Sequence, residues 1–388
     1  MGGCGHVGLP FALVVAKRGL NVTLFDLNRV AVEQVNAGIM PFDEPGAGPV
    51  LERVLADGRL RATTDSAVVK QAEHVVVVIG TPIDEHLNPD LNAVQLAITE
   101  IAESLVDGQI LMLRSTVYPG VTAMVERLIA RLGVDVDVAF CPERIAEGRA
   151  MIELCELPQI VAARSQRALD RATKFLRVLT DDFVYLEPEE AELAKLFTNT
   201  WRYIRFATAN QLFMMANDFG LDYEKIRTAV TYNYPRASDL PGAGFAAGPC
   251  LFKDTMQLAA FNNNNFQLGQ ASVMTNEGLP LYIVARLERR YDLAQMTVGI
   301  LGMSFKAGSD DIRSSLSYKL KRILAFKAKR VLTTDPYVSV DPALVSLDEV
   351  LRESDLLIVG APHPEYRDIE TDLPVVDISN LRERGVQV

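Results

Sequence analysis

Three glycines at the start of the chain constrain its fold more than any other feature. Gly3, Gly5 and Gly8 have the spacing Gly-x-Gly-x-x-Gly, and the sequence after them predicts a helix and then the apolar strand 21–26, which ends at Asp26. Glycines at this spacing allow a tight turn and let backbone amides approach a pyrophosphate where a helix begins. A carboxylate after the next strand binds a ribose 2′-hydroxyl and repels a 2′-phosphate. This region therefore predicts a Rossmann-like domain that binds NAD rather than NADP; a glycine turn that binds nothing is the alternative.

The strand that precedes such a glycine loop is missing, because the sequence begins at the loop itself. A sheet without its first strand would expose the edges of the neighbouring strands. We therefore expect a truncated or misassigned start, and an upstream strand of about five apolar residues, since strands of this kind run about four to eight residues.

The remaining sequence alternates apolar runs with helical patterns on both sides of a helical middle. Residues 188–221 have an acidic start, no internal proline and Gly220 near the end, which predicts one helix of roughly thirty residues. The apolar runs are typical of parallel strands that are covered on both faces. We predict strands within 21–26, 74–80, 109–116, 136–143, 159–164, 296–303, 330–335, 356–361 and 374–379.

These patterns predict an α/β protein with two doubly wound Rossmann-like domains joined by a long central helix. A chain of 388 residues is long enough for two or three domains. We place the boundaries at 1–187, 188–285 and 286–388.

Composition narrows the classes of function. The net charge of −11 argues against a general nucleic-acid or membrane surface. The four cysteines are widely spaced and form no Cys-x-x-Cys pair, and the four histidines are scattered, so we expect neither a disulfide framework nor a metal site. No signal peptide or long apolar run is present in the sequence, which favours a cytoplasmic location.

Cys250 is the strongest candidate for a nucleophile. It follows the glycine-rich segment 242–248, and Lys253 and Asp254 come three and four positions later. The ammonium group favours the thiolate, and the carboxylate can orient a water molecule or share a proton. A buried, inert thiol is the usual alternative, and it is the preferred interpretation for the other cysteines.

Three further sets of polar residues are candidates by position. Thr116 ends a predicted strand, and ligands of parallel sheets bind at such strand ends. By position alone, Thr116 could equally be a turn residue with no role in ligand binding. Glu143 and Glu147 have an i,i+4 spacing that would place both carboxylates on one helical face. The simpler alternative to a functional pair is a solvated helix start, where the helix dipole favours acidic residues. Lys195 and Asn199 repeat this spacing on the long helix, where they can stabilise an oxyanion or lie at the surface.

The whole chain resembles the nucleotide-sugar dehydrogenases, the UDP-glucose and GDP-mannose dehydrogenase family. The resemblance rests on the motifs GCGHVGLP, GTPIDEH, RSTVYPG, CPERIAEG, AKLFTNTW, GPCLFKD and GMSFKAGSDDIRSS. Together, and in this order, these motifs are highly specific for the family. The resemblance implies an NAD-binding domain, a central dimerisation region with the cysteine loop, and a nucleotide-sugar-binding domain. It also implies a homodimer or a larger homo-oligomer, with the long helix at the dimer interface, and a setting in polysaccharide biosynthesis.

The resemblance implies roles for particular residues. Those implied for catalysis are Thr116, Glu143, Lys195, Asn199, Cys250 and Asp254. Those implied for cofactor binding are Gly3, Gly5, His6, Val7, Gly8, Asp26, Thr81, Thr116, Glu147 and Arg313. Those implied for substrate binding are Glu143, Lys195, Asn199, Arg236, Lys253 and Lys306. Within this set, Arg236 would serve the partner subunit's active site, and its spacing to the cysteine differs from the usual form.

The activity implied by the resemblance is a four-electron oxidation. Two NAD molecules would convert the C6 hydroxyl of a nucleotide sugar to a carboxylate through a thiohemiacetal and a thioester on Cys250. Thr116 and Asp254 would hold a water molecule, Glu143 would assist hydrolysis, and Lys195 and Asn199 would stabilise the oxyanion.

The substrate stays open at this stage. UDP-glucose is the main expectation, and a UDP-N-acetylhexosamine or GDP-mannose is the alternative, because the loop reads Phe-Ala-Ala-Gly-Pro-Cys where many members read Phe-Gly-Gly-Ser-Cys. A basic residue expected shortly after the ribose aspartate is also absent, and Ala31 stands there. Less favoured are a two-electron hydroxy-acid dehydrogenase, which needs no cysteine, and a non-catalytic NAD-binding protein.

Overall fold

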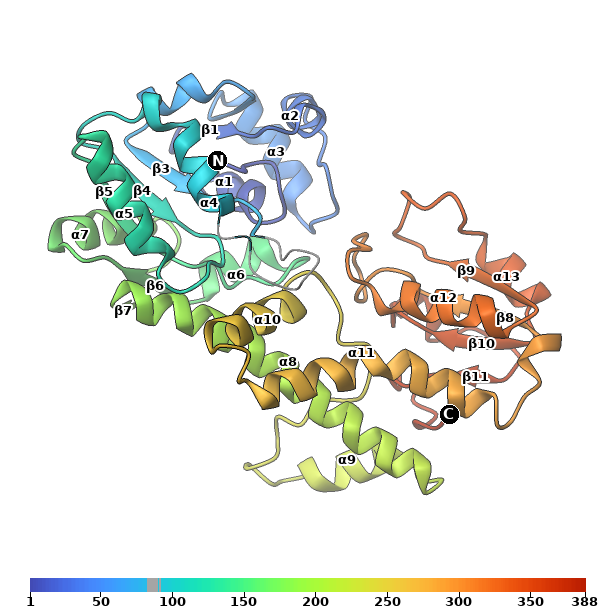
Figure 1. The fold of residues 1–388 in the computed structure, drawn as a ribbon. Helices are drawn as coiled ribbons and strands as arrows, with labels where there is room; N and C mark the ends of the chain where they lie inside the picture. The colour runs from blue at the N-terminus through green and yellow to red at the C-terminus, as the bar shows by residue number, and fades with distance from the viewer. Residues whose placement is uncertain (82–89, 91) are drawn as a thin grey trace. The chain divides into compact units, whose positions relative to one another are not determined.

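The computed structural model describes residues 1–81, 90 and 92–388, and it divides into two compact units, Met1–Thr198 and Asn199–Val388. Each unit contains a mainly parallel sheet with helices packed against it (Figure 1). The long helix α8 (Pro188–Asp218) crosses the division. The prediction of two Rossmann-like domains joined by a long central helix is therefore confirmed, whereas the three-part boundaries stay a prediction. No described helix is long and apolar enough to cross a lipid bilayer.

The first unit alternates strands with helices. Its strands are β1 (Val22–Phe25), β2 (Leu60–Thr63), β3 (His74–Val77), β4 (Ile110–Leu113), β5 (Asp137–Phe140), β6 (Gln159–Ala162) and β7 (Phe183–Leu186). Its helices are α1 (Gly8–Lys17), α2 (Arg29–Asn36), α3 (Ala47–Ala56), α4 (Asn92–Glu100), α5 (Val121–Leu132), α6 (Ala150–Glu156) and α7 (Gln166–Leu176), with short 3₁₀ turns η1 (Ser66–Gln71) and η2 (Ala102–Ser104).

The strands of the first unit form two separate sheets. One has the order β1-β2 and the other β3-β4-β5-β6-β7, and every pairing is parallel except that of β5 with β6. Every residue of β4, β5 and β6 is buried, which explains their continuous apolar sequence. The sequence analysis missed β2 and β7. The strand β2 alternates buried and exposed residues, and β7 is a short apolar run that is only partly buried.

The second unit begins within α8. Its other helices are α9 (Tyr223–Thr231), α10 (Leu251–Phe261), α11 (Gln267–Leu287), α12 (Leu316–Lys327) and α13 (Leu347–Glu353), with 3₁₀ turns η3 (Leu293–Gln295) and η4 (Pro364–Tyr366). Its parallel sheet has the order β11-β10-β8-β9, formed by β8 (Thr297–Leu301), β9 (Arg330–Thr334), β10 (Leu356–Val359) and β11 (Val375–Val376). A single apolar core joins Phe213 of α8 and Ile283 of α11 to Ile300 of β8 and Leu320 of α12.

Asp335, directly after β9, organises the loop that follows β8. Its side chain accepts hydrogen bonds from the backbone N–H groups of Met303 and Ser304 at 2.6 and 2.9 Å, and it lies 3.0 Å from the buried His363 ring. Burial alone would raise the pKa of Asp335, but the His363 ring and the backbone donors lower it to about 2. The carboxylate is therefore a stabilising part of this unit.

We expect Asp335→Asn to remove a pH-dependent part of the stability. The folded pKa of about 2 lies below the ordinary value of 3.8, so the stabilisation is present above pH 3.8 and is lost as pH falls toward 2. The shift corresponds to about 2 kcal/mol. Urea unfolding between pH 6 and pH 2 measures this, with the exposed Asp368→Asn as the control; the same pH slope in Asp335→Asn as in wild type would contradict the account.

Candidate functional site

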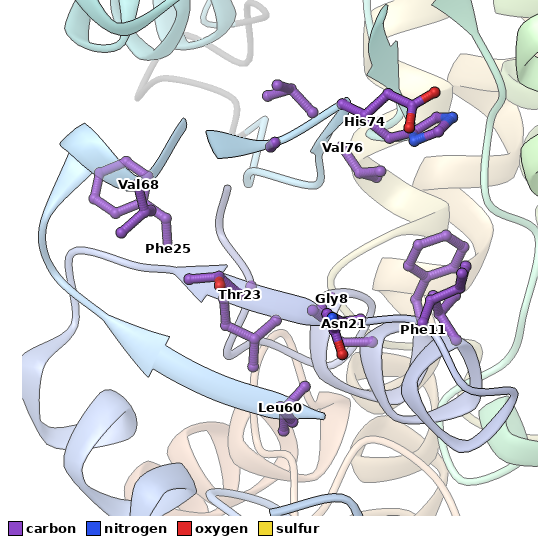
Figure 2. Close-up of a pocket in the computed structure, with 18 of the residues that line it drawn as sticks. Gly8, Phe11, Asn21, Thr23, Phe25, Leu60, Val68, His74 and Val76 are labelled. Atoms are coloured by element: carbon purple, nitrogen blue, oxygen red, sulfur yellow. The ribbon is translucent and has the colours of Figure 1, made fainter. Parts of the chain in front are cut away.

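The glycine loop leads into α1 with the packing that a dinucleotide site requires. A Cβ atom on Gly8 would lie 2.7 Å from the carbonyl oxygen of Gly2 and 2.8 Å from the Cα of Gly3, so only glycine allows this close approach. By contrast, a Cβ on Gly5 would meet no described atom closer than 4.0 Å, which leaves its backbone accessible. Because α1 begins at Gly8 (Figure 2), its positive dipole end can bind a pyrophosphate here. Val7 is the N-cap residue of this helix.

Asp26, which directly follows β1, closes the same loop. Its carboxylate accepts hydrogen bonds from the backbone N–H groups of Cys4 and Asn28, each at 2.9 Å. These bonds fix the carboxylate beside the glycine turn. This is the position in which a Rossmann-like domain recognises a ribose 2′-hydroxyl.

The carboxyl ends of β3 and β4 bring two of the predicted threonines together. Thr81 donates a hydrogen bond to the backbone carbonyl of Thr116 at 2.5 Å, and Thr81 is buried. The rest of the GTPIDEH motif, residues 82–86, lies outside the described residues. Both threonines thus lie at the edge of the sheet where parallel folds bind ligands.

Glu143 forms a buried ion pair with Arg114. Its carboxylate accepts a hydrogen bond from the Arg114 guanidinium and further bonds from the backbone N–H groups of Arg144 and Ile145 at 2.7 and 3.2 Å. Burial alone would raise the pKa of Glu143, but the Arg114 charge and these hydrogen bonds lower it. Glu143 is therefore ionised at neutral pH inside the protein.

The expectation that Glu143 and Glu147 share one helical face is wrong. The segment 141–146 after β5 is neither helix nor strand, and a turn follows before α6 begins. The backbone N–H of Glu143 bonds to the carbonyl of Arg114, just after β4, at 3.1 Å, and not to a carbonyl within its own segment as in a helix. The carboxylate of Glu147 lies 3.8 Å from the His6 ring, which also contacts the Phe42 ring at a tilt.

Lys195 and Asn199 lie one turn apart on α8, and both are buried, with 7% and 5% exposure. The interpretation of these two as surface residues is therefore wrong. Burial of an ammonium and an amide on one helical face requires polar partners, which supports a functional interpretation.

Cys250 lies at the first position of an organised polar cluster in the second unit. It is the exposed N-cap residue of α10, where the helix dipole favours negative charge. One turn into α10, the fully buried Asp254 accepts a hydrogen bond from the Asn199 amide at 2.5 Å and pairs with the Lys253 ammonium at 3.1 Å. The structure thus brings Asn199 of α8 together with Lys253 and Asp254, which lie within one turn of Cys250 on α10.

The loop that carries Lys306 packs against the cysteine loop. Gly248 has a φ of +106°, and a Cβ atom there would lie 2.6 Å from the Phe305 ring. The Lys306 ammonium lies over the same ring, 5.4 Å from its centroid, and Ser304 donates a hydrogen bond to the Lys306 carbonyl at 2.7 Å. Lys306 and the cysteine loop are therefore held in one structural unit.

Two predicted arginines lie in other arrangements. Arg313 forms a bidentate ion pair with Asp311, with its nearest contact at 2.6 Å. Arg236 is exposed and stacks on Tyr234, with its guanidinium carbon 4.9 Å from the ring centroid. These contacts do not test the cofactor role expected for Arg313 or the intersubunit role expected for Arg236, so both roles stay predictions.

Arg114 is the buried partner of Glu143 that the sequence analysis missed. It is 1% exposed, follows the buried strand β4, and contacts Gln159 at 3.1 Å in addition to Glu143. An arginine directly after a fully apolar run was the available signal, because a charge at the end of a buried strand requires an opposite charge nearby.

Comparisons with known proteins cover the chain from end to end. Models of the UDP-glucose/GDP-mannose dehydrogenase family match its NAD binding domain to residues 1–178, its central domain to 189–277 and its UDP binding domain to 299–384. A UDP-N-acetyl-D-mannosamine dehydrogenase of Pyrococcus horikoshii is 31% identical over 95% of this chain and 90% of its own length. One of Campylobacter jejuni is 27% identical over 95% and 96%. A UDP-glucose dehydrogenase structure from Pyrobaculum islandicum has a TM-score of 0.91 and 26% identity over 99% and 95%.

Proposed function

Because the chain belongs to the UDP-glucose/GDP-mannose dehydrogenase family and is an NAD-dependent oxidoreductase, we propose that it oxidises the C6 hydroxyl of a UDP-N-acetylhexosamine to a carboxylate. This proposal replaces the main expectation from the sequence, UDP-glucose, with the alternative given there, a UDP-N-acetylhexosamine. Similar curated proteins named UDP-N-acetyl-D-mannosamine dehydrogenase support the N-acetylhexosamine, although the fold also matches a UDP-glucose dehydrogenase closely. The observation that carries the proposed chemistry is the cluster of Asn199, Asp254 and Lys253 behind Cys250.

The N-terminal unit fits NAD. The accessible backbone of Gly5, the start of α1 and the carboxylate of Asp26 provide a pyrophosphate cradle and a ribose acceptor. When bound, NAD accepts a hydride from C6, and the oxidation of an alcohol to a carboxylate removes two hydrides.

In the proposed mechanism, Cys250 divides the oxidation into easier steps. Its thiolate adds to the C6 carbon of the aldehyde to form a thiohemiacetal, whose oxyanion Lys195 and Asn199 stabilise. Loss of the second hydride leaves a thioester on Cys250. Water then cleaves the C–S bond, which releases the carboxylate product and returns the thiol.

The environments of the two carboxylates suit different tasks. Asp254 is buried beside the nucleophile, in contact with an amide and an ammonium, so we assign it to proton transfer at the hydroxyl. Glu143 is ionised and held by Arg114, which lowers its basicity, so we assign it to orienting the water that cleaves the thioester. Glu143 thus assists hydrolysis mainly by holding the attacking water in place.

A panel of sugar nucleotides tests the substrate. The purified protein is mixed with NAD and with UDP-N-acetylmannosamine, UDP-N-acetylgalactosamine, UDP-glucose or GDP-mannose, and NADH is followed by absorbance. The proposal expects the highest kcat/KM with one of the two N-acetylhexosamines. A preference for UDP-glucose or GDP-mannose would contradict the substrate class and leave the chemistry intact, whereas turnover of a simple hydroxy acid would contradict both.

We expect NAD to be preferred over NADP because of Asp26. Repulsion between its carboxylate and the 2′-phosphate should disfavour NADP by about 1–3 kcal/mol, which is roughly 5- to 150-fold in kcat/KM. Asp26→Asn should narrow this preference, while the exposed Glu33→Gln on α2 should leave it unchanged. Equal kcat/KM values for the two cofactors in wild type would show that Asp26 does not select the cofactor.

An exposed apolar surface on α8 supports a homo-oligomer. Trp201 and Met215 on α8 are 57% and 55% exposed, and Phe219, directly after the helix, is 83% exposed; such large apolar groups rarely gather on the surface of a monomer. We propose that α8 forms a dimer interface. Light scattering on the purified protein measures the mass, and a monomer at micromolar concentration would contradict the proposal.

A further inference from the structure

The loop that carries Lys306 packs closely against the turn that follows β10. The backbone N–H of Ala361 bonds to the carbonyl of Gly302 at 3.2 Å. A Cβ atom on Gly302 would lie 2.6 Å from the backbone nitrogen of Ala361, so the two segments are as close as their backbones allow. This packing brings His363, two residues further along the turn, beside the loop 303–308.

His363 is fully buried, and both nitrogens of its ring make hydrogen bonds. Its Nδ1 accepts a bond from the backbone N–H of Gly308 at 3.1 Å. Because an N–H group can only donate, Nδ1 is unprotonated and Nε2 carries the ring hydrogen. Nε2 lies 3.0 Å from the Asp335 carboxylate and 3.2 Å from the Ser304 hydroxyl. The ring is therefore neutral and has a defined donor side and acceptor side.

These bonds hold both ends of the segment that contains Lys306. At its start, the hydroxyl of Ser304 donates to the carbonyl of Lys306 at 2.7 Å, and the backbone N–H of Ser304 donates to Asp335 at 2.9 Å. At its end, Gly308 donates to the ring. One imidazole thus connects Ser304 and Gly308 on either side of Lys306.

Two tyrosine rings keep His363 in this orientation. The centroid of the Tyr337 ring lies 4.9 Å from that of His363, and the Tyr366 ring meets it edge-on at 5.7 Å. In a close-packed interior, rotation of the imidazole would require both tyrosines to move. Packing and hydrogen bonds of this kind hold a ligand-binding residue in one place.

We propose that His363 is a positioning residue for the substrate: its neutral ring fixes the segment 304–308 so that the Lys306 ammonium meets a phosphate group of the nucleotide sugar. The inference rests on the proposed function and on the substrate contact expected for Lys306. His363 is buried and acts only through the loop. A phosphate contact remote from C6 is equally strong in the ground state and the transition state, so its loss raises KM and spares kcat.

Two variants test this role. In His363→Gln the side-chain amide can still donate to Asp335, as Nε2 does, but the acceptor for Gly308 is lost. Lys306→Met removes the ammonium and keeps a long side chain. The probe is UDP, because it carries the phosphates without the sugar and binds without reaction. Its dissociation constant is measured by titration calorimetry with the full chain.

We expect each single variant to weaken UDP binding about tenfold, which is roughly the loss of one charge-assisted hydrogen bond. Because His363 acts through Lys306, the double variant should bind UDP no more weakly than Lys306→Met alone. With the preferred sugar nucleotide, His363→Gln should raise KM by a similar factor and change kcat less than about twofold. A general loss of structure would not give this pattern.

Tyr366→Phe is the matched control. It removes the hydrogen bond from the Tyr366 hydroxyl to the carbonyl of Thr334 at 3.2 Å and keeps the ring beside His363. Its UDP affinity should equal that of wild type. If circular dichroism shows that His363→Gln does not fold, Ser304→Ala takes its place, since it removes only the hydroxyl between the ring and the Lys306 carbonyl.

UDP affinity at the wild-type value in His363→Gln, or in Ser304→Ala where that variant is used, would overturn the proposal. Additive losses in the double variant would overturn it too, because they would show that His363 affects the site without Lys306. Wild-type affinity in Lys306→Met, or a loss in Tyr366→Phe as large as in His363→Gln, would have the same consequence. These results leave the oxidation chemistry untouched, whereas a wild-type chain that does not bind UDP would contradict the proposed function as well.

Discussion

Cys250→Ala is expected to abolish the formation of the acid product. Without the thiol no thioester can form, so the second oxidation has no covalent route. Loss of a covalent nucleophile removes about three or more orders of magnitude in rate. The cofactor site in the first unit does not contain Cys250, so NAD binding should survive. Uronate formation is measured by chromatography, and NAD affinity by titration calorimetry.

Cys155→Ala is the matched control for this prediction. Cys155 is half-buried on α6 and packs against apolar neighbours, so its loss removes a thiol without touching the cluster around Cys250. This variant should form uronate at close to the wild-type rate. If Cys250→Ala also forms uronate at that rate, the cysteine loop serves packing and the covalent mechanism is wrong.

Arg114→Met is expected to cause the largest loss of stability. The guanidinium is 1% exposed and forms the ion pair with Glu143, which is 6% exposed. Removing one partner of a buried pair leaves the other charge uncompensated, which costs about 3–5 kcal/mol. Circular dichroism during urea unfolding measures the free energy of unfolding.

The double variant Arg114→Met with Glu143→Gln separates charge from packing. Removing both charges avoids the isolated carboxylate, so most of the lost stability should return. A double variant as unstable as Arg114→Met would show that the loss comes from the packing of Arg114, whose guanidinium lies 4.7 Å from the Phe11 ring centroid. A single variant that loses less than about 1 kcal/mol would contradict the account of the ion pair.

Local patterns were sufficient to predict the fold, because its central strands are apolar on both faces and its long helix has clear ends. The strands β4, β5 and β6 are fully buried, and α8 covers most of the predicted segment. The strand β2 escaped detection because Arg61 in its centre is exposed. A strand of four residues that is buried on one face has too few apolar residues for its alternating pattern to be recognised in the sequence.

The site was predictable where residues that act together are close in sequence. Lys253 and Asp254 follow Cys250 within one turn of α10, so their proximity could be inferred. The pairing of Glu143 with Arg114 spans 29 positions and depends on the ends of neighbouring strands. The helical spacing of Glu143 and Glu147 was misleading, because the backbone N–H of Glu143 bonds to Arg114, after β4, and the segment forms no helix.

The ratio of NADH formed to sugar nucleotide consumed tests the covalent four-electron mechanism most directly. The wild-type protein is given a limiting amount of its preferred sugar nucleotide and excess NAD, and both NADH and the remaining sugar nucleotide are quantified at completion. The account predicts two NADH per sugar, with little free aldehyde, because the thiohemiacetal on Cys250 retains the intermediate for the second oxidation. A ratio of one, with the aldehyde as the final product, would contradict it.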